Sequence, residues 1–293
     1  MISTSFYTED HYLLRGQLFC TEKAMQGRVI VAGATGVPQA FYRRFAQFAS
    51  EQGFETLTFD YRGIGQSKPE TLEGFEMNLL DWGKQDLAAA VQFMSKDDAP
   101  LFIVGHSYGG HAFGLLPNHQ KVTGAYIFGT GAGWHGYMPL FERVKVLTMW
   151  NIVLPLLTWW KGYCAWNLLG MGEDLPKNVF KQWRHWCRFR HYFFDDPTMD
   201  GIEKLFQSVQ TPMVAANALD DLWAMPESRD AFIQHYSNAP LTRLDLSPKI
   251  LGGKIGHMGY FRKNAIPLWQ ASLDWFTAIN KENKAIWAHQ DSG

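Results

Sequence analysis

A serine between glycines is the residue best suited to chemistry in this 293-residue sequence. Ser107 lies in the run Gly105-His106-Ser107-Tyr108-Gly109, directly after the apolar residues 101–104 and before a helical pattern. A strand, a sharp turn and a helix in this order expose the serine hydroxyl and place helix amides near a developing oxyanion. The run therefore predicts a nucleophilic serine rather than an idle serine in a glycine-rich turn.

A serine nucleophile needs a base, and the base needs an acid that orients it. Where a serine occupies this kind of turn, the acid follows a late strand and the histidine comes last in the chain. The apolar run 213–218 leads directly into Asp220 and Asp221. We expect Asp221, which is nearer the following turn, to be the acid, with Asp220 as the alternative.

The predicted base is His257, one of ten histidines. It lies in the glycine-rich segment 252–259, downstream of a strand pattern at 241–246, where a loop can bring an imidazole to the serine. His106 adjoins Ser107 in the chain, but its side chain points away from that of the serine. We therefore expect His106 to serve in packing.

Two backbone amides are expected to form an oxyanion hole. One is the amide of Tyr108, and the other comes from the loop 33–38 after the first long strand. Ala34 is favoured because it directly follows the strand end, and Thr35 is the alternative. Because backbone amides are the donors, side-chain identity discriminates poorly between the two.

Strand and helix patterns must position these residues. An antiparallel hairpin is expected within residues 2–20, and strands then alternate with helices, which is typical of a mostly parallel sheet. A glycine-rich turn at 60–67 matches neither a P-loop nor a dinucleotide motif, and an Asp60–Arg62 network is expected to hold it. The alternation stops over 134–205, which predicts an α/β core of residues 1–133 and 206–293 interrupted by a helical insertion.

These motifs resemble the α/β-hydrolase superfamily, and within it the bacterial serine hydrolases related to serine aminopeptidases and monoacylglycerol lipases. The resemblance rests on residues 59–67, the turn 105–109, the Asp221 loop and the Gly256-His257 pair. It implies an eight-stranded, mostly parallel sheet with a helical cap after the sixth strand, and a triad of Ser107, Asp221 and His257.

A serine in this turn, where dehalogenases and most epoxide hydrolases of the fold have an aspartate, implies acyl transfer without a cofactor. We expect hydrolysis of a carboxylic ester. The alternatives are an acyltransferase, thioesterase or aminopeptidase with the same triad, and a catalytically idle binding protein.

The insertion is unusually aromatic. It holds seven of the 12 tryptophans, namely Trp134, Trp150, Trp159, Trp160, Trp166, Trp183 and Trp186. Many of these rings must form the core of the insertion, but ligand sites are also largely apolar. The predicted lining of an apolar acyl pocket is Trp134, Trp159 and Trp183, together with Trp223 and Met258 beside the catalytic loops.

Composition excludes several other functions. A net charge of −1 argues against nucleic acid as a partner, and three widely spaced cysteines indicate neither a disulfide framework nor a zinc site. The longest uncharged apolar run, 146–160, is shorter than the roughly 20 residues of a spanning helix. We expect a cytoplasmic protein without stable membrane insertion, although this run is apolar enough to lie on a bilayer surface. The oligomeric state is not encoded in any pattern that we identify.

Overall fold

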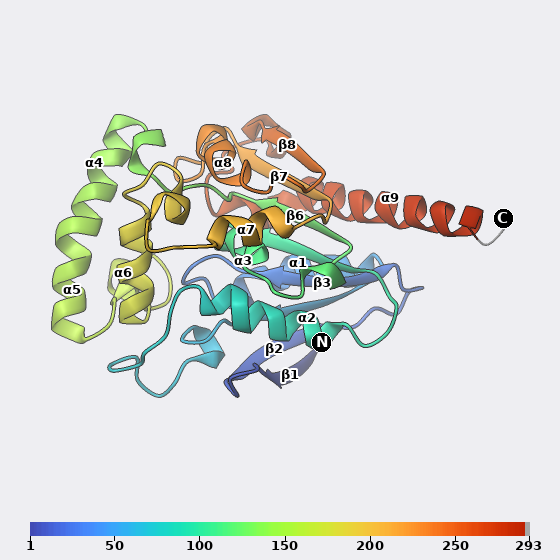
Figure 1. Ribbon diagram of the computed structural model, residues 1–293, viewed down its shortest axis with the longest axis horizontal. Helices are drawn as coiled ribbons and strands as arrows, with labels where there is room; N and C mark the ends of the chain where they lie inside the picture. Colours follow the sequence, from blue (N-terminus) through green and yellow to red (C-terminus); the bar gives the residue numbers. More distant parts are fainter. Residues whose placement is uncertain (291–293) are drawn as a thin grey trace.

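The fold is built around one eight-stranded sheet (Figure 1). The computed structural model describes residues 1–290, and the side chains of residues 1–282. The strands are β1 (Ile2–Tyr7), β2 (Leu13–Phe19), β3 (Gly27–Ala32), β4 (Phe54–Phe59), β5 (Leu101–His106), β6 (Gly124–Phe128), β7 (Met213–Ala218) and β8 (Leu241–Leu246). They follow the order β1-β2-β4-β3-β5-β6-β7-β8. The pairs β1–β2 and β2–β4 are antiparallel and the others parallel, which confirms the predicted hairpin and the mostly parallel sheet.

Helices cover both faces of this sheet, so the central strands β3, β5, β6 and β7 are buried along their whole length and can be continuously apolar. The α-helices are α1 (Arg43–Glu51), α2 (Ala88–Met94), α3 (Tyr108–Gly114), α4 (Leu140–Thr148), α5 (Leu154–Lys161), α6 (Lys177–Trp186), α7 (Ile202–Ser208), α8 (Pro226–Ile233) and α9 (Ile266–Gln290). Helices α1 and α9 pack on one face, and α2, α3 and α8 on the other.

Helix α1 shows how the sequence sets these elements. Phe45, Ala46 and Ala49 form its buried stripe, and the chain leaves the helix through Gly53 at a φ of +94°. A Cβ at Gly53 would lie 2.9 Å from the carbonyl oxygen of Ala24, so glycine is required both by the backbone conformation and by the space. Gly53 thus lets the chain turn from α1 into β4.

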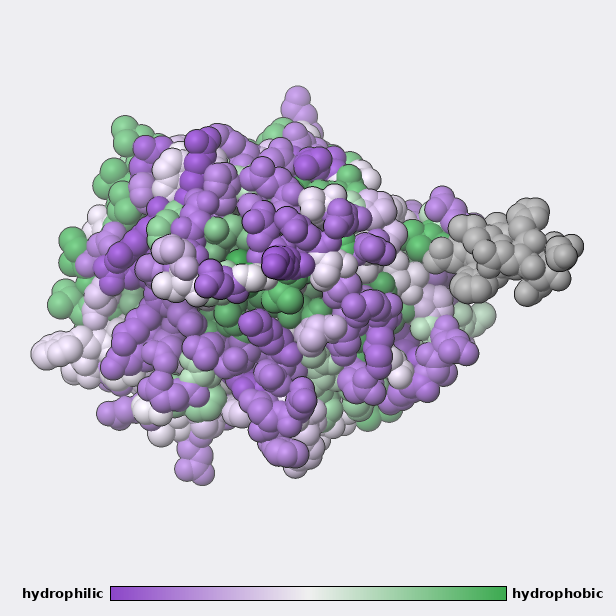
Figure 2. All heavy atoms as spheres, viewed as in Figure 1, coloured by the Kyte–Doolittle hydropathy of each residue, from purple (hydrophilic) through white to green (hydrophobic). Residues whose placement is uncertain are grey.

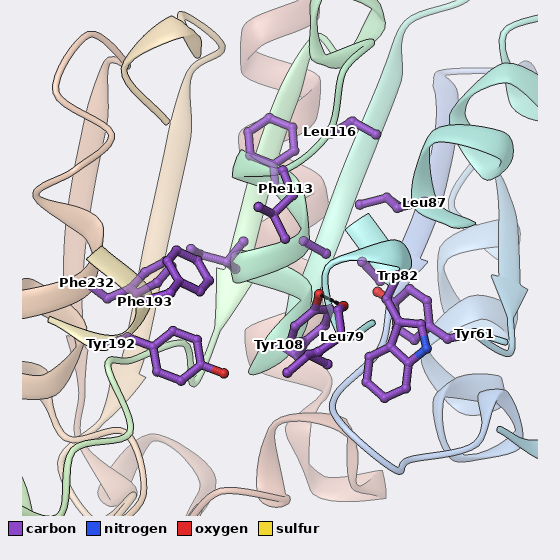
Figure 3. Close-up of a cluster of buried hydrophobic side chains, with 14 of the residues drawn as sticks. Tyr61, Leu79, Trp82, Leu87, Tyr108, Phe113, Leu116, Tyr192, Phe193 and Phe232 are labelled. Carbon is purple, nitrogen blue, oxygen red and sulfur yellow. Dashed lines mark hydrogen bonds between the residues drawn. The ribbon is translucent and has the colours of Figure 1, made fainter. Parts of the chain in front are cut away.

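An aromatic cluster supports the turn that carries Ser107 (Figure 3). The indole of Trp82 stacks on Tyr61 with 5.1 Å between ring centroids, and the ring of Tyr108 meets it edge-on at 5.2 Å. The indole nitrogen of Trp82 donates to the carbonyl oxygen of Arg62. Both rings are fully buried with their polar atoms bonded, which fixes the first residue of α3 against the core.

The chain between β6 and β7 forms the helical cap, as predicted. In Figure 1, α4 and α5 lie along the left edge of the molecule, and α6 lies between them and the sheet. A π-helical turn, η6 (Met149–Val153), joins α4 to α5. Within the described residues, no helix is both long enough and apolar enough to cross a membrane.

The turn at 60–67 differs from the prediction, because Asp60 and Arg62 do not pair. Asp60 accepts hydrogen bonds from the amide and side chain of Gln39 and from the amide of Gln66. Arg62 binds the fully buried Asp86 at 2.7 Å and Asp10 at 2.6 Å. The turn is structural, but its acid and its base face different partners.

Candidate active site

Ser107 lies at the tip of a sharp turn between β5 and α3. Its φ of 51° and ψ of −106° fall in a region that non-glycine residues rarely adopt. The Ser107 amide donates to the carbonyl oxygen of Phe128, and its carbonyl accepts from the hydroxyl of Thr130. A Cβ at Gly109 would lie 2.1 Å from the carbonyl oxygen of Ala32, so only glycine allows α3 to approach β3 this closely. The surroundings thus hold the serine in a strained and partly exposed position.

The structure brings Ser107, His257 and Asp221 together in one hydrogen-bonded chain. Nε2 of His257 lies 3.0 Å from the Ser107 hydroxyl, and Nδ1 lies 2.9 and 3.0 Å from the two carboxylate oxygens of Asp221. Because a carboxylate only accepts, Nδ1 carries a proton, and Nε2 is then free to accept the proton of the serine. This is the tautomer that a general base requires.

The protein holds Asp221 in its charged form. Its side chain is fully buried, and it accepts hydrogen bonds from the hydroxyl of Tyr260 and the amides of Trp223 and Ala224 as well as from His257. Burial by itself would raise the pKa of Asp221. The electrostatic interaction with His257 and these hydrogen bonds outweigh burial and lower that pKa below its usual value.

Asp220, the alternative acid, has a different position. Its two carboxylate oxygens each accept a backbone amide at 3.0 Å, one from Ile255 and one from Gly256. It therefore anchors the loop that carries His257 without touching the imidazole. The two adjacent aspartates therefore have different partners: Asp221 bonds to the imidazole of His257, and Asp220 bonds to the backbone of the two residues that precede this histidine.

His106 does more than pack, which sequence reasoning did not foresee. Its Nε2 lies 2.8 Å from the carbonyl oxygen of His257, and its Nδ1 lies 2.9 Å from the hydroxyl of Tyr42. A carbonyl only accepts, so Nε2 carries the proton and Nδ1 accepts from Tyr42. Burial, together with the electrostatic influence of the neighbouring His257, lowers the pKa of His106 to about 3, so the ring is neutral.

The same hydroxyl corrects the expected oxyanion donor. The Ala34 amide donates to the oxygen of Tyr42 at 2.7 Å, so it is already engaged. A chain of hydrogen bonds thus runs from the Ala34 amide through Tyr42 and His106 to the backbone of His257. Thr35, the other predicted donor, lines the same cavity as Ser107. Tyr108 is the first residue of α3, where an amide has no partner within its own helix.

A cavity of about 200 Å³ opens beside Ser107 between the cap and the core. Its lining is mainly apolar and consists of Ala34, Thr35, Val37, Ser107, Lys145, Trp166, Met171, Trp183, Trp223, His257 and Met258. Three of the predicted pocket residues, Trp183, Trp223 and Met258, lie in this wall. Trp166 and Met171 were missed, although their place in the aromatic insertion was a usable signal.

The other two predicted pocket residues lie elsewhere. Trp159 is 85% exposed on the outer side of α5, and Trp134 packs against Tyr137 with 5.1 Å between ring centroids. The reason is geometric. Helix α5 has apolar residues on both sides, and only the side with Leu154 and Thr158 faces the protein.

Trp223 connects the cavity wall to the triad. Its ring stacks on that of His257 with 6.0 Å between centroids and an angle of 29°. Its indole nitrogen donates to Glu142 of α4 at 3.0 Å, and its amide donates to Asp221. The cap is therefore hydrogen-bonded to the loop that carries the acid.

Solved structures share this fold at low sequence identity. A soluble variant of monoglyceride lipase from Saccharomyces cerevisiae is 18% identical, with a TM-score of 0.63 over 94% of each chain. The alpha/beta hydrolase GrgF from Penicillium is 16% identical, with a TM-score of 0.63 over 96% of this chain and 99% of that one. An esterase from Pyrococcus furiosus is 14% identical, with a TM-score of 0.61 over 94% of this chain and 89% of that one. At such identities the likeness shows the fold alone.

Sequence comparison is more specific. Among curated proteins, none matches this chain. The model of the serine aminopeptidase family S33 matches residues 24–182, which include the first long strand, the Ser107 turn and most of the cap. The chain therefore belongs to the serine aminopeptidase family S33 of the α/β-hydrolases.

Proposed function

We propose that this hydrolase cleaves a carboxylic ester through an acyl-enzyme on Ser107. The observation that carries the proposal is the hydrogen-bonded chain from Asp221 through His257 to Ser107, with distances of 2.9 and 3.0 Å. These distances lie within the reach that proton transfer needs. The buried, charged Asp221 favours the imidazolium that forms when His257 takes the serine proton.

The reaction follows from this geometry. His257 removes the proton of Ser107 as the serine oxygen attacks the ester carbonyl, and the carbonyl oxygen becomes an oxyanion. We assign its stabilisation to the amides of Tyr108 and Thr35. As the tetrahedral intermediate collapses, His257 gives its proton to the departing alkoxide, which leaves as an alcohol. Water, activated by the same histidine, then attacks the acyl-enzyme and releases the acid.

The cavity supports a small apolar substrate. At about 200 Å³ it lies below the roughly 300–1,000 Å³ of pockets that hold drug-sized ligands, so short acyl groups should fit best. Three indole rings and two methionines in the wall favour an uncharged, hydrocarbon-rich group.

The same wall argues against an aminopeptidase. A peptide with a free amino terminus needs an acid near the scissile bond, and no acid is among the residues that line the described cavity. Its wall carries Lys145 instead. The carboxylates that bond to wall residues are already engaged, Asp221 by the imidazole of His257 and Glu142 by the indole of Trp223. An ester with no charge on its acyl side fits this wall better.

The test compares wild type, Ser107→Ala and the control Ser208→Ala on p-nitrophenyl acetate, butyrate and octanoate. Ser208 is an exposed serine of α7, so its loss should leave the rate unchanged. Removing the nucleophile should lower kcat by about 10⁴–10⁶-fold. Equal hydrolysis by wild type and Ser107→Ala, or a folded wild type whose Ser107 does not react with a fluorophosphonate, would favour an idle binding protein. Faster turnover of thioester or aminoacyl substrates would redirect the proposal to those bonds.

A further inference from the structure

The outer side of α4, η6 and α5 exposes a long row of apolar side chains. We call it the outer cap face, and it consists of Leu140, Phe141, Val144, Ile152, Leu156, Trp159 and Trp160. Phe141 is 84% exposed and Trp159 85%. Figure 2 shows the corresponding hydrophobic colour along the left edge of the molecule, where Figure 1 places α4 and α5. Single exposed apolar residues are ordinary, but a continuous patch of this kind marks an interaction site.

The spacing makes this a property of the helices rather than of scattered loops. Phe141, Val144, Ile152, Leu156 and Trp159 recur at three- or four-residue steps, or a multiple of them, and so share one side of the helical column. The opposite side carries a second apolar stripe, Val146, Met149, Trp150 and Leu154, which is buried against the protein. The inner stripe accounts for the packing of the cap, and the outer stripe is left without a partner in the described chain.

Basic groups flank this face. The helical column 140–161 carries three basic residues, Arg143, Lys145 and Lys161, against one acid, the buried Glu142, which gives it a net charge of +2. Lys161 lies 4.2 Å from the ring of Trp160, and Arg184 binds Asn151 of η6. Basic groups therefore lie directly beside the apolar rings.

We propose that the outer cap face docks onto an anionic phospholipid surface. An interfacial helix presents apolar side chains to the acyl region and basic side chains to the headgroups, which is the composition found here. A second copy of the chain fits less well, because a two-fold contact would bring together the basic groups beside the two faces, with no exposed acid among residues 140–161 to neutralise them. Docking needs no catalysis, so it stands or falls independently of the proposed ester hydrolysis.

The position of the cavity gives such docking a use. Lys145 of α4 and Trp166 and Met171, which follow α5 in the chain, line the cavity beside Ser107. Met171 and its neighbours Leu168 and Leu169 are themselves exposed. A protein seated on the outer cap face would therefore hold the cavity wall close to the lipid surface, where apolar esters partition.

The first experiment measures co-flotation of the full chain with vesicles of phosphatidylcholine alone and with added phosphatidylglycerol. The Ser107→Ala variant is used in parallel, so that binding is read without any turnover. We expect recovery with the anionic vesicles and not with the neutral ones, and weaker binding as salt is raised. Equal recovery with both vesicles, or recovery with neither, would overturn the proposal.

The second experiment separates the two components of the face. Phe141→Ser combined with Trp159→Ser should reduce vesicle binding at least tenfold, and Lys161→Ala combined with Arg184→Ala should reduce it by about fivefold for each charge removed. Tyr7→Ser combined with Ile250→Ser removes two exposed apolar side chains from the surface outside the cap. This pair is the matched control, and we expect it to leave vesicle binding unchanged. All six side chains are at least partly exposed, so the fold should survive, and circular dichroism checks this.

Sedimentation equilibrium tests whether a second copy of the chain, rather than lipid, covers the outer cap face. A monomer at the concentrations of the flotation assay is the expected result. A dimer that the Phe141→Ser and Trp159→Ser pair dissociates would assign the face to a second copy of the chain and overturn docking on lipid.

Discussion

The catalytic core and the cap are both rich in aromatic rings, but they place them differently. In the core, Trp82, Tyr42 and Tyr260 are fully buried and each polar atom has a partner. In the cap, Trp150 and Trp166 are buried, Trp183 lines the cavity, and Trp159 and Trp160 face outward. The three core rings fix the positions of hydrogen bonds, whereas the cap also uses aromatic rings as cavity wall and as exposed apolar surface. Substitutions should therefore affect the chemical step in the core and substrate choice in the cap.

The strongest test of this division replaces each of the two adjacent aspartates. Asp221→Asn should lower kcat/KM by about 10⁴-fold, because an amide cannot hold His257 in the required tautomer. Asp220→Asn keeps one acceptor for the amides of Ile255 and Gly256 and should cost about tenfold or less. Steady-state kinetics on one short ester measures both. Equal losses would show that the two carboxylates do not have separate tasks.

Acid should weaken the core through its buried histidines. Burial lowers the pKa of His106 to about 3 and that of His111 to about 4, from an ordinary 6.5. Between these values the unfolded chain binds protons that the folded chain does not, so stability is fully present above pH 6.5 and is lost as the pH falls. Proton binding linked to each histidine should lower the free energy of unfolding by about 2 kcal/mol between pH 7 and pH 5. Urea unfolding at the two pH values tests this, and His111→Gln should show the smaller loss.

Removing one hydroxyl from the core should slow catalysis without weakening binding. Tyr42→Phe breaks the link from Ala34 to His106 and frees the ring that supports the His257 backbone. We expect kcat to fall by about fivefold with KM unchanged, since one hydrogen bond is worth about 1 kcal/mol. Tyr126→Phe, on the same face of the sheet, is the control. A rise in KM with kcat unchanged would place Tyr42 in substrate binding instead.

The smallest effect is expected in the cap, and it concerns selectivity rather than rate. Trp183→Ala removes a wall of the cavity. It should raise the ratio of kcat/KM for octanoate over butyrate esters by several-fold, because an apolar pocket discriminates by about 1–3 kcal/mol for each methylene group that it admits or rejects. Trp159→Ala, which changes an outward ring, should leave this ratio within about twofold. An equal shift in both variants would contradict the placement of these two rings.

The parts that sequence predicted best were those with a local signal. The glycines around Ser107, the acids after β7 and the glycine-rich loop around His257 each require a particular backbone turn, and a turn is encoded by a few adjacent residues. Strand and helix alternation was equally local, so the sheet and the inserted cap could be predicted.

The parts that failed depend on partners distant in the chain. Nothing near Arg62 indicates that it binds Asp86 and Asp10, and nothing near Ala34 indicates that Tyr42 occupies its amide. The wrong pocket residues have the same cause. A helix with apolar stripes on two sides does not specify which stripe turns inward, so Trp159 and Trp183 could not be told apart by composition.

The hydrogen bond between Trp223 and Glu142 connects the cap directly to the loop that carries the catalytic acid. A displacement of α4 that opens the cavity must either break this bond or pull on the indole, and the amide of Trp223 holds Asp221 two residues away. The position of α4 and the position of the catalytic acid are therefore linked through one side chain, Trp223.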